Sequence, residues 1–246
     1  HFTPGFLFVN GDKNPRSQIP GVGQVYFWEL PLFILGIWSI LKSKKRLHWL
    51  VLMMLLIAPI PASLTRESPH ALRSILMAPT LAILSSFGAV FLLEKIKVYK
   101  VTILIGIVVV SLVSFEFYIV KFFEQYPIAT SKDWQYGYKE IFSKYKNEIE
   151  NARKVIISDE YGQPYIFALY YLKYDPVEFR KTVEYNDVSN WGASTVKSFD
   201  KFEFKKPNSE DLVTGSLVFS DKQINSSVPQ DSIEFLDGSE AFYVYK

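Results

Sequence analysis

Four long apolar segments, separated by short polar loops, dominate the first half of the chain. They lie at roughly residues 25–41, 47–64, 75–93 and 101–120, and each has about 17 to 20 residues. An α-helix of that length, rising about 1.5 Å per residue, crosses about 30 Å of hydrocarbon. Buried helices of a large soluble protein are the alternative, but they need far more polar chain around them than this sequence contains. The pattern therefore predicts a membrane all-α region with about four transmembrane helices.

The hydrophobic period changes beyond residue 131. Aromatic and aliphatic residues at helical spacing predict an amphipathic helix over 134–149, followed by a short buried strand at 154–159 and a helix over 164–173. The later segments are short and β-like: 199–205, 215–220, 232–236 and 241–245. The last two flank Asp237-Gly238, a typical hairpin turn. Residues 132–246 are therefore expected to form a small α/β domain after a transmembrane part at 1–131.

Charge separates the same two regions. The chain is 49% hydrophobic and 21% charged, with a net charge of +2. Residues 1–131 carry 12 basic and 6 acidic side chains, whereas residues 132–246 carry 15 and 19. Because the second region is acidic and has no arginine-rich run, nucleic acid is not expected as a partner. The absence of cysteine excludes a disulfide framework, a thiolate nucleophile and a cysteine-ligated metal, but it leaves the compartment open.

The loops predict an orientation in the membrane. Seven basic residues lie in two of them: Lys42, Lys44, Lys45, Arg46, Lys95, Lys97 and Lys100. The positive-inside rule places these loops in the cytoplasm. Residues 1–24, the loop 62–74 and everything after about residue 126 would then share the extracytoplasmic face. We therefore expect a multi-pass protein of the cytoplasmic membrane with an extracytoplasmic C-terminal domain.

The loop Thr65–Ser74 holds the first candidate residues, namely Arg66, His70 and Arg73. Positive charge near a membrane surface is costly without a nearby anion, and the phosphate of a lipid or lipid-linked substrate is the most available one. The alternatives remain open. The two arginines can snorkel to headgroups, and the histidine can cap a helix or bond to a backbone carbonyl.

The segment 1–24 holds a second group, Asp12, Asn14 and Arg16, among glycines and prolines that indicate ordered turns. These side chains are expected either to line a polar cavity or to form a turn held by hydrogen bonds of the Asx type. All three histidines lie in the apolar half, and the acidic half has no glycine-rich phosphate loop and no metal-ligand cluster. No metal site is expected, and residues 132–246 are interpreted as a binding or bracing module.

Three long strings carry a resemblance to a known family: HFTPGFLFVNGDKNPRSQIPGVGQVYFWELP, TRESPHALRS and DEYGQPYIFALYYLKYDP. They resemble bacterial members of the dolichyl-phosphate-mannose protein mannosyltransferase family, which is glycosyltransferase family 39 of the GT-C superfamily. The similarity spans most of the chain and is strongest over residues 1–93 and 155–176.

The resemblance implies a multi-pass glycosyltransferase that moves a sugar from a polyprenyl-phosphate donor to an acceptor on the extracytoplasmic face. It implies that the catalytic acidic residue lies in a loop upstream of His1, so no catalytic residue is expected here and a transmembrane part is expected to be missing. Arg66, His70 and Arg73 would then bind the lipid phosphate, and Asp12, Asn14 and Arg16 would line the cavity. No cofactor is implied. Two other classes remain open, a piece of a lipid-phosphate or sugar transporter and a non-catalytic membrane scaffold.

Overall fold

The computed structural model describes residues 1–188, 192, 194–225 and 227–246. The chain divides into two compact units, His1–Pro127 and Ile128–Lys246. Each unit has a hydrophobic core of its own, so each is described by itself.

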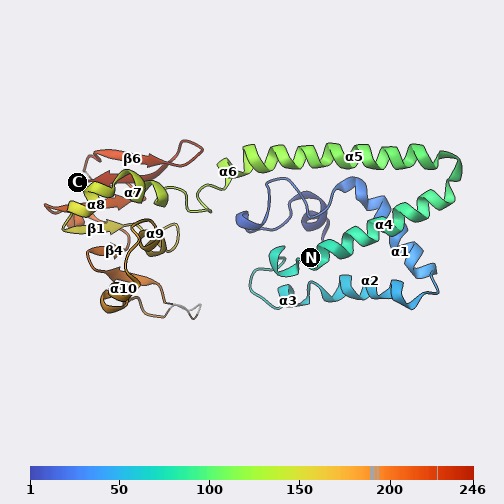
Figure 1. Cartoon of the computed structure of the whole chain (residues 1–246), viewed down its shortest axis with the longest axis horizontal. Coiled ribbons are helices and arrows are strands. Elements are labelled where there is room, and N and C mark those ends of the chain that lie inside the picture. The colour runs from blue at the N-terminus through green and yellow to red at the C-terminus, as the bar shows by residue number, and fades with distance from the viewer. Residues whose placement is uncertain (189–191, 193, 226) are drawn as a thin grey trace. The chain divides into compact units, whose positions relative to one another are not determined.

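The first unit is helical (Figure 1). Its α-helices are α1 (Leu30–Lys42), α2 (Arg46–Ile57), α3 (Ile60–Ser63), α4 (Met77–Lys95), α5 (Lys100–Val120) and α6 (Tyr126–Ala129), which crosses the boundary between the units. Short 3-10 turns occupy Pro15–Ser17, Phe27–Glu29, Leu72–Ser74 and Lys97–Tyr99, and π-helical turns occupy Gly5–Val9 and Lys121–Gln125.

Three helical stretches among the described residues are long and apolar enough to cross a membrane: Arg46–Ser63, Met77–Lys95 and Lys97–Ala129. These stretches correspond to the second, third and fourth apolar segments of the sequence, whereas the first segment holds a shorter helix. There, α1 has 13 residues and spans only about 20 Å. Pro31 lies in its first turn, the place in a helix where a missing N–H does no harm.

The residues just before α1 form the 3-10 turn Phe27–Glu29, and their side chains bond to other helices. The Tyr26 hydroxyl donates to the carbonyl oxygen of Ser114 at 2.9 Å, and Trp28 Nε1 donates to Ser114 Oγ at 3.0 Å. Glu29 accepts a hydrogen bond from Ser85 Oγ at 2.8 Å. These bonds tie the entrance of α1 to α4 and α5.

Helices α1 and α4 pack most closely, and α2 packs beside them. Gly36 and Gly88 lie at the contact, where each backbone meets the other helix directly. The His48 ring packs against the Phe87 ring with 4.7 Å between centroids, which joins α2 to α4. In Figure 1 the N-terminal segment, the α3–α4 loop and the last turns of α5 lie at one end of this unit. The two lysine-rich links, α1–α2 and α4–α5, lie at the other end.

The second unit is an α/β fold around one mixed sheet of seven strands. The strands are β1 (Lys154–Ile157), β2 (Glu184–Tyr185), β3 (Val196–Phe199), β4 (Phe202–Phe204), β5 (Ser216–Ser220), β6 (Asp231–Glu234) and β7 (Glu240–Tyr245), in the order β2-β3-β4-β1-β5-β7-β6. The central β1 runs parallel to β4 and β5, and the other neighbours pair antiparallel. The helices are α7 (Tyr138–Lys144), α8 (Lys146–Asn151), α9 (Pro164–Tyr171) and α10 (Pro176–Thr182).

The expected α/β character and the hairpin at Asp237-Gly238 are confirmed, because β6 and β7 pair antiparallel across that turn. Two details were wrong. The helix expected over 134–149 begins only at Tyr138, after Gly137 with a φ of 105°, and it breaks at Tyr145. The strand expected over 199–205 is a β3–β4 hairpin that turns at Asp200 with a φ of 47°. Gly137 and Asp200 have positive φ and set the start of the helix and the turn of the hairpin, and apolar periodicity does not reveal such residues.

Candidate functional site

Asp12 joins the N-terminal segment to the loop between α3 and α4. Its side chain is buried, at 3% exposure. Oδ1 accepts a hydrogen bond from the backbone N–H of Asn14 at 2.9 Å, which is an Asx turn. Oδ2 accepts one from the backbone N–H of Ala71 at 2.6 Å, 59 residues away, and it lies 3.4 Å from His70 Nδ1. One carboxylate therefore shapes the turn and holds the loop.

A second link runs through two histidines. The backbone N–H of His70 donates to His1 Nε2 at 3.1 Å, and His1 Nδ1 lies 3.3 Å from Ser63 Oγ. The His70 ring is buried, with Glu67 Oε2 3.9 Å from its Nε2 and Asp12 on its other nitrogen. The carbonyl of His70 accepts a hydrogen bond from Ser74 Oγ at 2.7 Å. His70 therefore lies inside the loop, in contact with protein on both sides.

The two arginines of the loop lie at its surface. Arg66 and Arg73 are both exposed. Arg73 Nη1 donates to Thr65 Oγ1 at 2.8 Å, and that hydroxyl donates to the carbonyl of Ala62 at 2.7 Å. Asp12 and His1 therefore hold the loop backbone in place, while Arg66 and Arg73 are exposed to solvent.

Asn14 and Arg16 have different surroundings. Asn14 Oδ1 accepts a hydrogen bond from the backbone N–H of Arg16 at 3.0 Å and caps the 3-10 turn Pro15–Ser17. Arg16 is exposed and lines a pocket of about 390 Å³, in which neither Asp12 nor Asn14 takes part. The structure therefore brings Asp12 to His70 and puts Arg16 at a separate hollow of the same unit.

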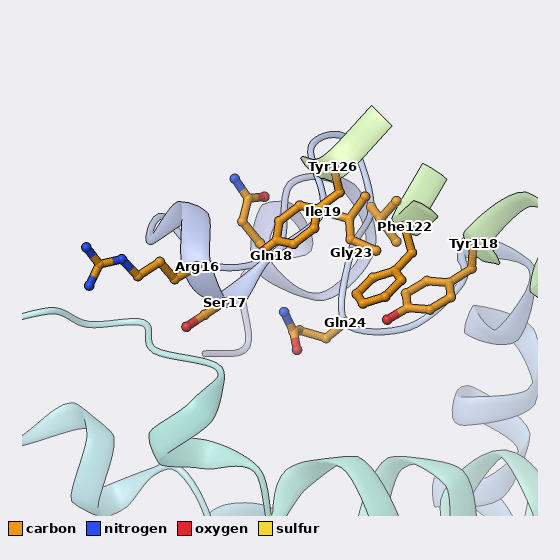
Figure 2. A pocket seen from close by; sticks show the side chains of 10 residues that line it. Arg16, Ser17, Gln18, Ile19, Gly23, Gln24, Tyr118, Phe122 and Tyr126 are labelled. Atoms are coloured by element: carbon orange, nitrogen blue, oxygen red, sulfur yellow. The ribbon is translucent and has the colours of Figure 1, made fainter. Parts of the chain in front are cut away.

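This pocket lies between the N-terminal segment and the stretch where α5 passes through the π-helical turn Lys121–Gln125 into α6, as Figure 2 shows. It is lined by Arg16, Ser17, Gln18, Ile19, Val22, Gly23, Gln24, Tyr118, Phe122 and Tyr126. The N-terminal segment is held there by two bonds to its backbone carbonyls: Tyr126 donates to Pro15 at 3.1 Å and Lys121 to Pro20 at 3.1 Å. In the figure the three aromatic rings form a row along one side, and the Arg16 guanidinium points away from them.

Sequence analysis missed His1 and Ser63 as partners of the loop, and the aromatic residues of the pocket. No spacing in the sequence could have indicated the first two, since His1 meets both Ser63 and His70 only through the folding of the unit. Tyr118, Phe122 and Tyr126 do share a spacing of four, the signal of one helix face. Among the described residues, no group of three or more histidine, aspartate or glutamate side chains is placed to hold a metal ion.

Comparison of the chain with protein-family models, with curated proteins and with solved structures finds no match in any of the three. A functional assignment therefore depends on the geometry described above and on the resemblance of the quoted strings.

Proposed function

We propose that this chain is part of an integral-membrane glycosyltransferase that moves a sugar from a polyprenyl-phosphate donor to an extracytoplasmic acceptor. The proposal is based on one observation, the exposed position of Arg66 and Arg73 on a fixed loop. Both are exposed at the end of the apolar helices, on a loop whose backbone is held by the buried Asp12 and the partly buried His1. The resemblance to the family 39 glycosyltransferases supports the same assignment.

The role proposed for the two guanidiniums is electrostatic. When the sugar leaves its carrier, negative charge develops on the lipid phosphate, and a fixed donor aimed at such charge is worth about 3 to 4 kcal/mol in other enzymes. Arginine suits this role because its planar fork binds phosphate through two hydrogen bonds. A loop held in place beforehand loses little entropy when it binds the phosphate.

The other candidates would support this pair. His70 is buried and contacts Asp12, so in this proposal it positions the loop. Asp12 and Asn14 would shape the N-terminal segment that lies against it. The catalytic base would come from outside this chain, as the resemblance implies, and the second unit would act as an extracytoplasmic binding or bracing module.

The test is substitution of the two arginines in the complete protein, in membranes supplied with a radiolabelled polyprenyl-phosphate sugar. We expect Arg66→Ala and Arg73→Ala each to lower the rate of transfer by about 10²- to 10³-fold, the usual loss when one such donor is removed. Arg66→Lys and Arg73→Lys keep the positive charge but lose the planar fork. Their rates of transfer should lie between those of the parent and of the alanine variants.

Arg46→Ala is the matched control, because Arg46 is an exposed arginine at the start of α2, at the opposite end of the unit. It should leave transfer within about twofold of the parent, since a surface charge far from the reacting phosphate is screened. Full transfer by both alanine variants of the loop would contradict the proposal and favour a non-catalytic membrane scaffold.

A further inference from the structure

The second unit begins directly after the last candidate span. That span, Lys97–Ala129, contains α5, which has 21 residues and covers about 32 Å, close to the thickness of the hydrocarbon of a bilayer. Thr130 and Ser131, which follow the span, are already buried. The backbone N–H of Trp134 donates to the carbonyl of Thr130 at 3.0 Å, so the chain turns at once. Trp134 is five residues past Ala129 and therefore lies within about 18 Å of the end of the span.

Contacts with Tyr161 fix the place of this turn in the second unit. Gln135 Nε2 donates to the carbonyl of Tyr161 at 2.7 Å. Lys132 Nζ lies over the Tyr161 ring, 5.4 Å from its centre. Tyr161 itself follows the carboxyl end of β1. The segment that leaves the span is therefore attached to the edge of the sheet where β1 ends.

The turn of the β6–β7 hairpin lies at the same edge. Its Phe235 ring meets the Tyr161 ring edge-on, with 5.2 Å between centroids. Leu236 follows in the turn and is 45% exposed, and Trp134 is 57% exposed. In Figure 1 this turn and the segment after α6 lie at the same end of the second unit. Lys132, Trp134 and Leu236 therefore share one edge, which we call the Trp134 edge.

The side chains of the Trp134 edge are those that favour the boundary between lipid and water. Tryptophan is enriched at the level of the headgroups, because its ring is apolar and its N–H is polar. Lysine lays its apolar stem along such a surface and keeps its ammonium group among the headgroups. Glu160, the acidic residue beside Tyr161, pairs with Lys206 at 2.9 Å, so its charge is compensated. A layer of lipid headgroups therefore matches the exposed groups of this edge.

The exposed apolar area favours a membrane over a protein partner. An aromatic side chain buries about 150 to 250 Å², and the edge offers only parts of Trp134 and Leu236. A stable protein interface needs about 800 Å² per partner. A small contact suffices next to a membrane span, because the covalent link keeps lipid at an effective concentration of about millimolar or more.

We infer that the Trp134 edge binds the headgroup layer of the bilayer that the preceding span crosses, with Trp134 and Leu236 in the interface and Lys132 against a lipid phosphate. The inference goes beyond the proposed sugar transfer. It requires the candidate spans to cross a bilayer, but it does not require Arg66 and Arg73 to bind a substrate.

The test measures the depth of single positions in nanodiscs of phosphatidylcholine and phosphatidylglycerol. The chain has no cysteine, so Leu236→Cys carries one nitroxide at the Trp134 edge. Thr214→Cys is the matched control, because Thr214 is exposed before β5, whereas the hairpin turn lies beyond the other end of that strand. Power-saturation EPR compares collisions with oxygen, which concentrates in lipid, and with a nickel chelate, which stays in water. We expect the nickel collision rate to be about threefold lower at 236 than at 214, and the oxygen rate to be higher.

Two substitutions, each combined with Leu236→Cys, identify the residues that hold the contact. Trp134→Ala and Lys132→Ala should each raise the nickel collision rate at 236 about twofold. Val228→Ala is the control, because Val228 is 82% exposed and lines a pocket with Thr214, away from the Trp134 edge. It should leave the rate at 236 unchanged. Thermal unfolding in the same nanodiscs identifies any variant that has lost its fold, and Trp134→Gln replaces Trp134→Ala if that variant unfolds.

Equal nickel collision rates at 236 and 214 overturn the inference, as does a low rate at 236 that neither Trp134→Ala nor Lys132→Ala changes. Low collision rates with both oxygen and nickel at 236 indicate a site closed by protein, which overturns it and assigns the edge to a protein partner. A chain that does not insert into the nanodisc overturns this inference and the proposed function together. Full sugar transfer by Arg66→Ala and Arg73→Ala contradicts the proposed function alone and leaves the membrane contact standing.

Discussion

At the scale of single residues, Asp231 of the second unit shows a marked charge effect. Lys144 Nζ lies 2.7 Å from its Oδ2 and the Tyr145 hydroxyl 2.6 Å from the same atom. The bond from Lys144, followed by those from Tyr145 and from the backbone N–H of Ser232, lowers the pKa of Asp231 to about 2. Burial, with the bond to Asp231, raises the pKa of Tyr145 to about 12.

A depressed carboxyl pKa means that the folded chain favours the ionised form. The stabilisation is then fully present above the ordinary pKa of 3.8 and is lost as the pH falls toward 2. The Asp231 side chain is 39% exposed, so solvent screening limits the contribution to about 0.5 to 1 kcal/mol.

We expect a carbon-13 NMR titration of the Asp231 carboxyl in the full chain to show a midpoint near 2. Lys144→Ala should move the midpoint upward toward 3.8, because the first cause of the shift is gone. Lys146→Ala is the control, since Lys146 pairs with Glu150 and not with Asp231. A midpoint that stays near 2 in Lys144→Ala would show that the lysine is not the cause.

At the scale of elements, the contact between α1 and α4 depends on two glycines. A Cβ added to Gly36 would overlap the carbonyl oxygen of Leu84, and one added to Gly88 would overlap that of Leu32. Backbones approach this closely only where both positions are small, which is the usual means of helix association in lipid. The aliphatic and aromatic side chains around the contact are buried: Leu32, Phe33, Ile40, Leu81 and Leu84.

Gly36→Ala and Gly88→Ala should therefore separate α1 from α4 and cost about 1 to 3 kcal/mol, the usual penalty of overpacking. Gly106→Ala is the matched control, because Gly106 lies in α5 and a Cβ there meets nothing within 4 Å. That change should be neutral or stabilising by up to about 1 kcal/mol, since alanine is the better helix former. Thermal unfolding in nanodiscs measures all three, and equal midpoints would refute the role given to the two contact glycines.

At the scale of the whole molecule, the distribution of charged loops predicts a topology. The lysine-rich links lie at one end of the first unit, and the loop of Arg66 and Arg73 lies at the other (Figure 1). The positive-inside rule then predicts that the arginine loop is extracytoplasmic. The headgroup of a polyprenyl-phosphate sugar on the extracytoplasmic side could reach Arg66 and Arg73 only in this orientation.

The chain has no cysteine, so single cysteines report topology without background. We expect Ser68→Cys, in the arginine loop, to react with a membrane-impermeant maleimide on intact cells. Lys44→Cys, in the α1–α2 link, should react only after the membrane is opened. Both positions are in loops of the structure rather than in helices. Labelling of Lys44→Cys but not Ser68→Cys on intact cells would reverse the orientation and remove the proposed phosphate site.

Local patterns in the sequence determined which segments became helices and which became strands. The apolar segments at 47–64, 75–93 and 101–120 coincide closely with α2 and α3, with α4 and with α5, and the segment at 154–159 contains β1. These features depend on neighbouring residues, because amphipathic period, chain length and turn residues act within one or two turns. The α/β character of residues 132–246 follows from the same signals.

Tertiary structure alone decided which distant residues meet. The bond from Ala71 to Asp12 and those from Tyr26 and Trp28 to Ser114 join residues 59 to 88 positions apart. The bond to Asp12 belongs to the loop in which His70 is buried and Arg66 and Arg73 are exposed. The bonds of Tyr26 and Trp28 lie just before α1, which is shorter than the span expected there. Such contacts follow from the packing of the whole unit, whose geometry no local window of sequence contains.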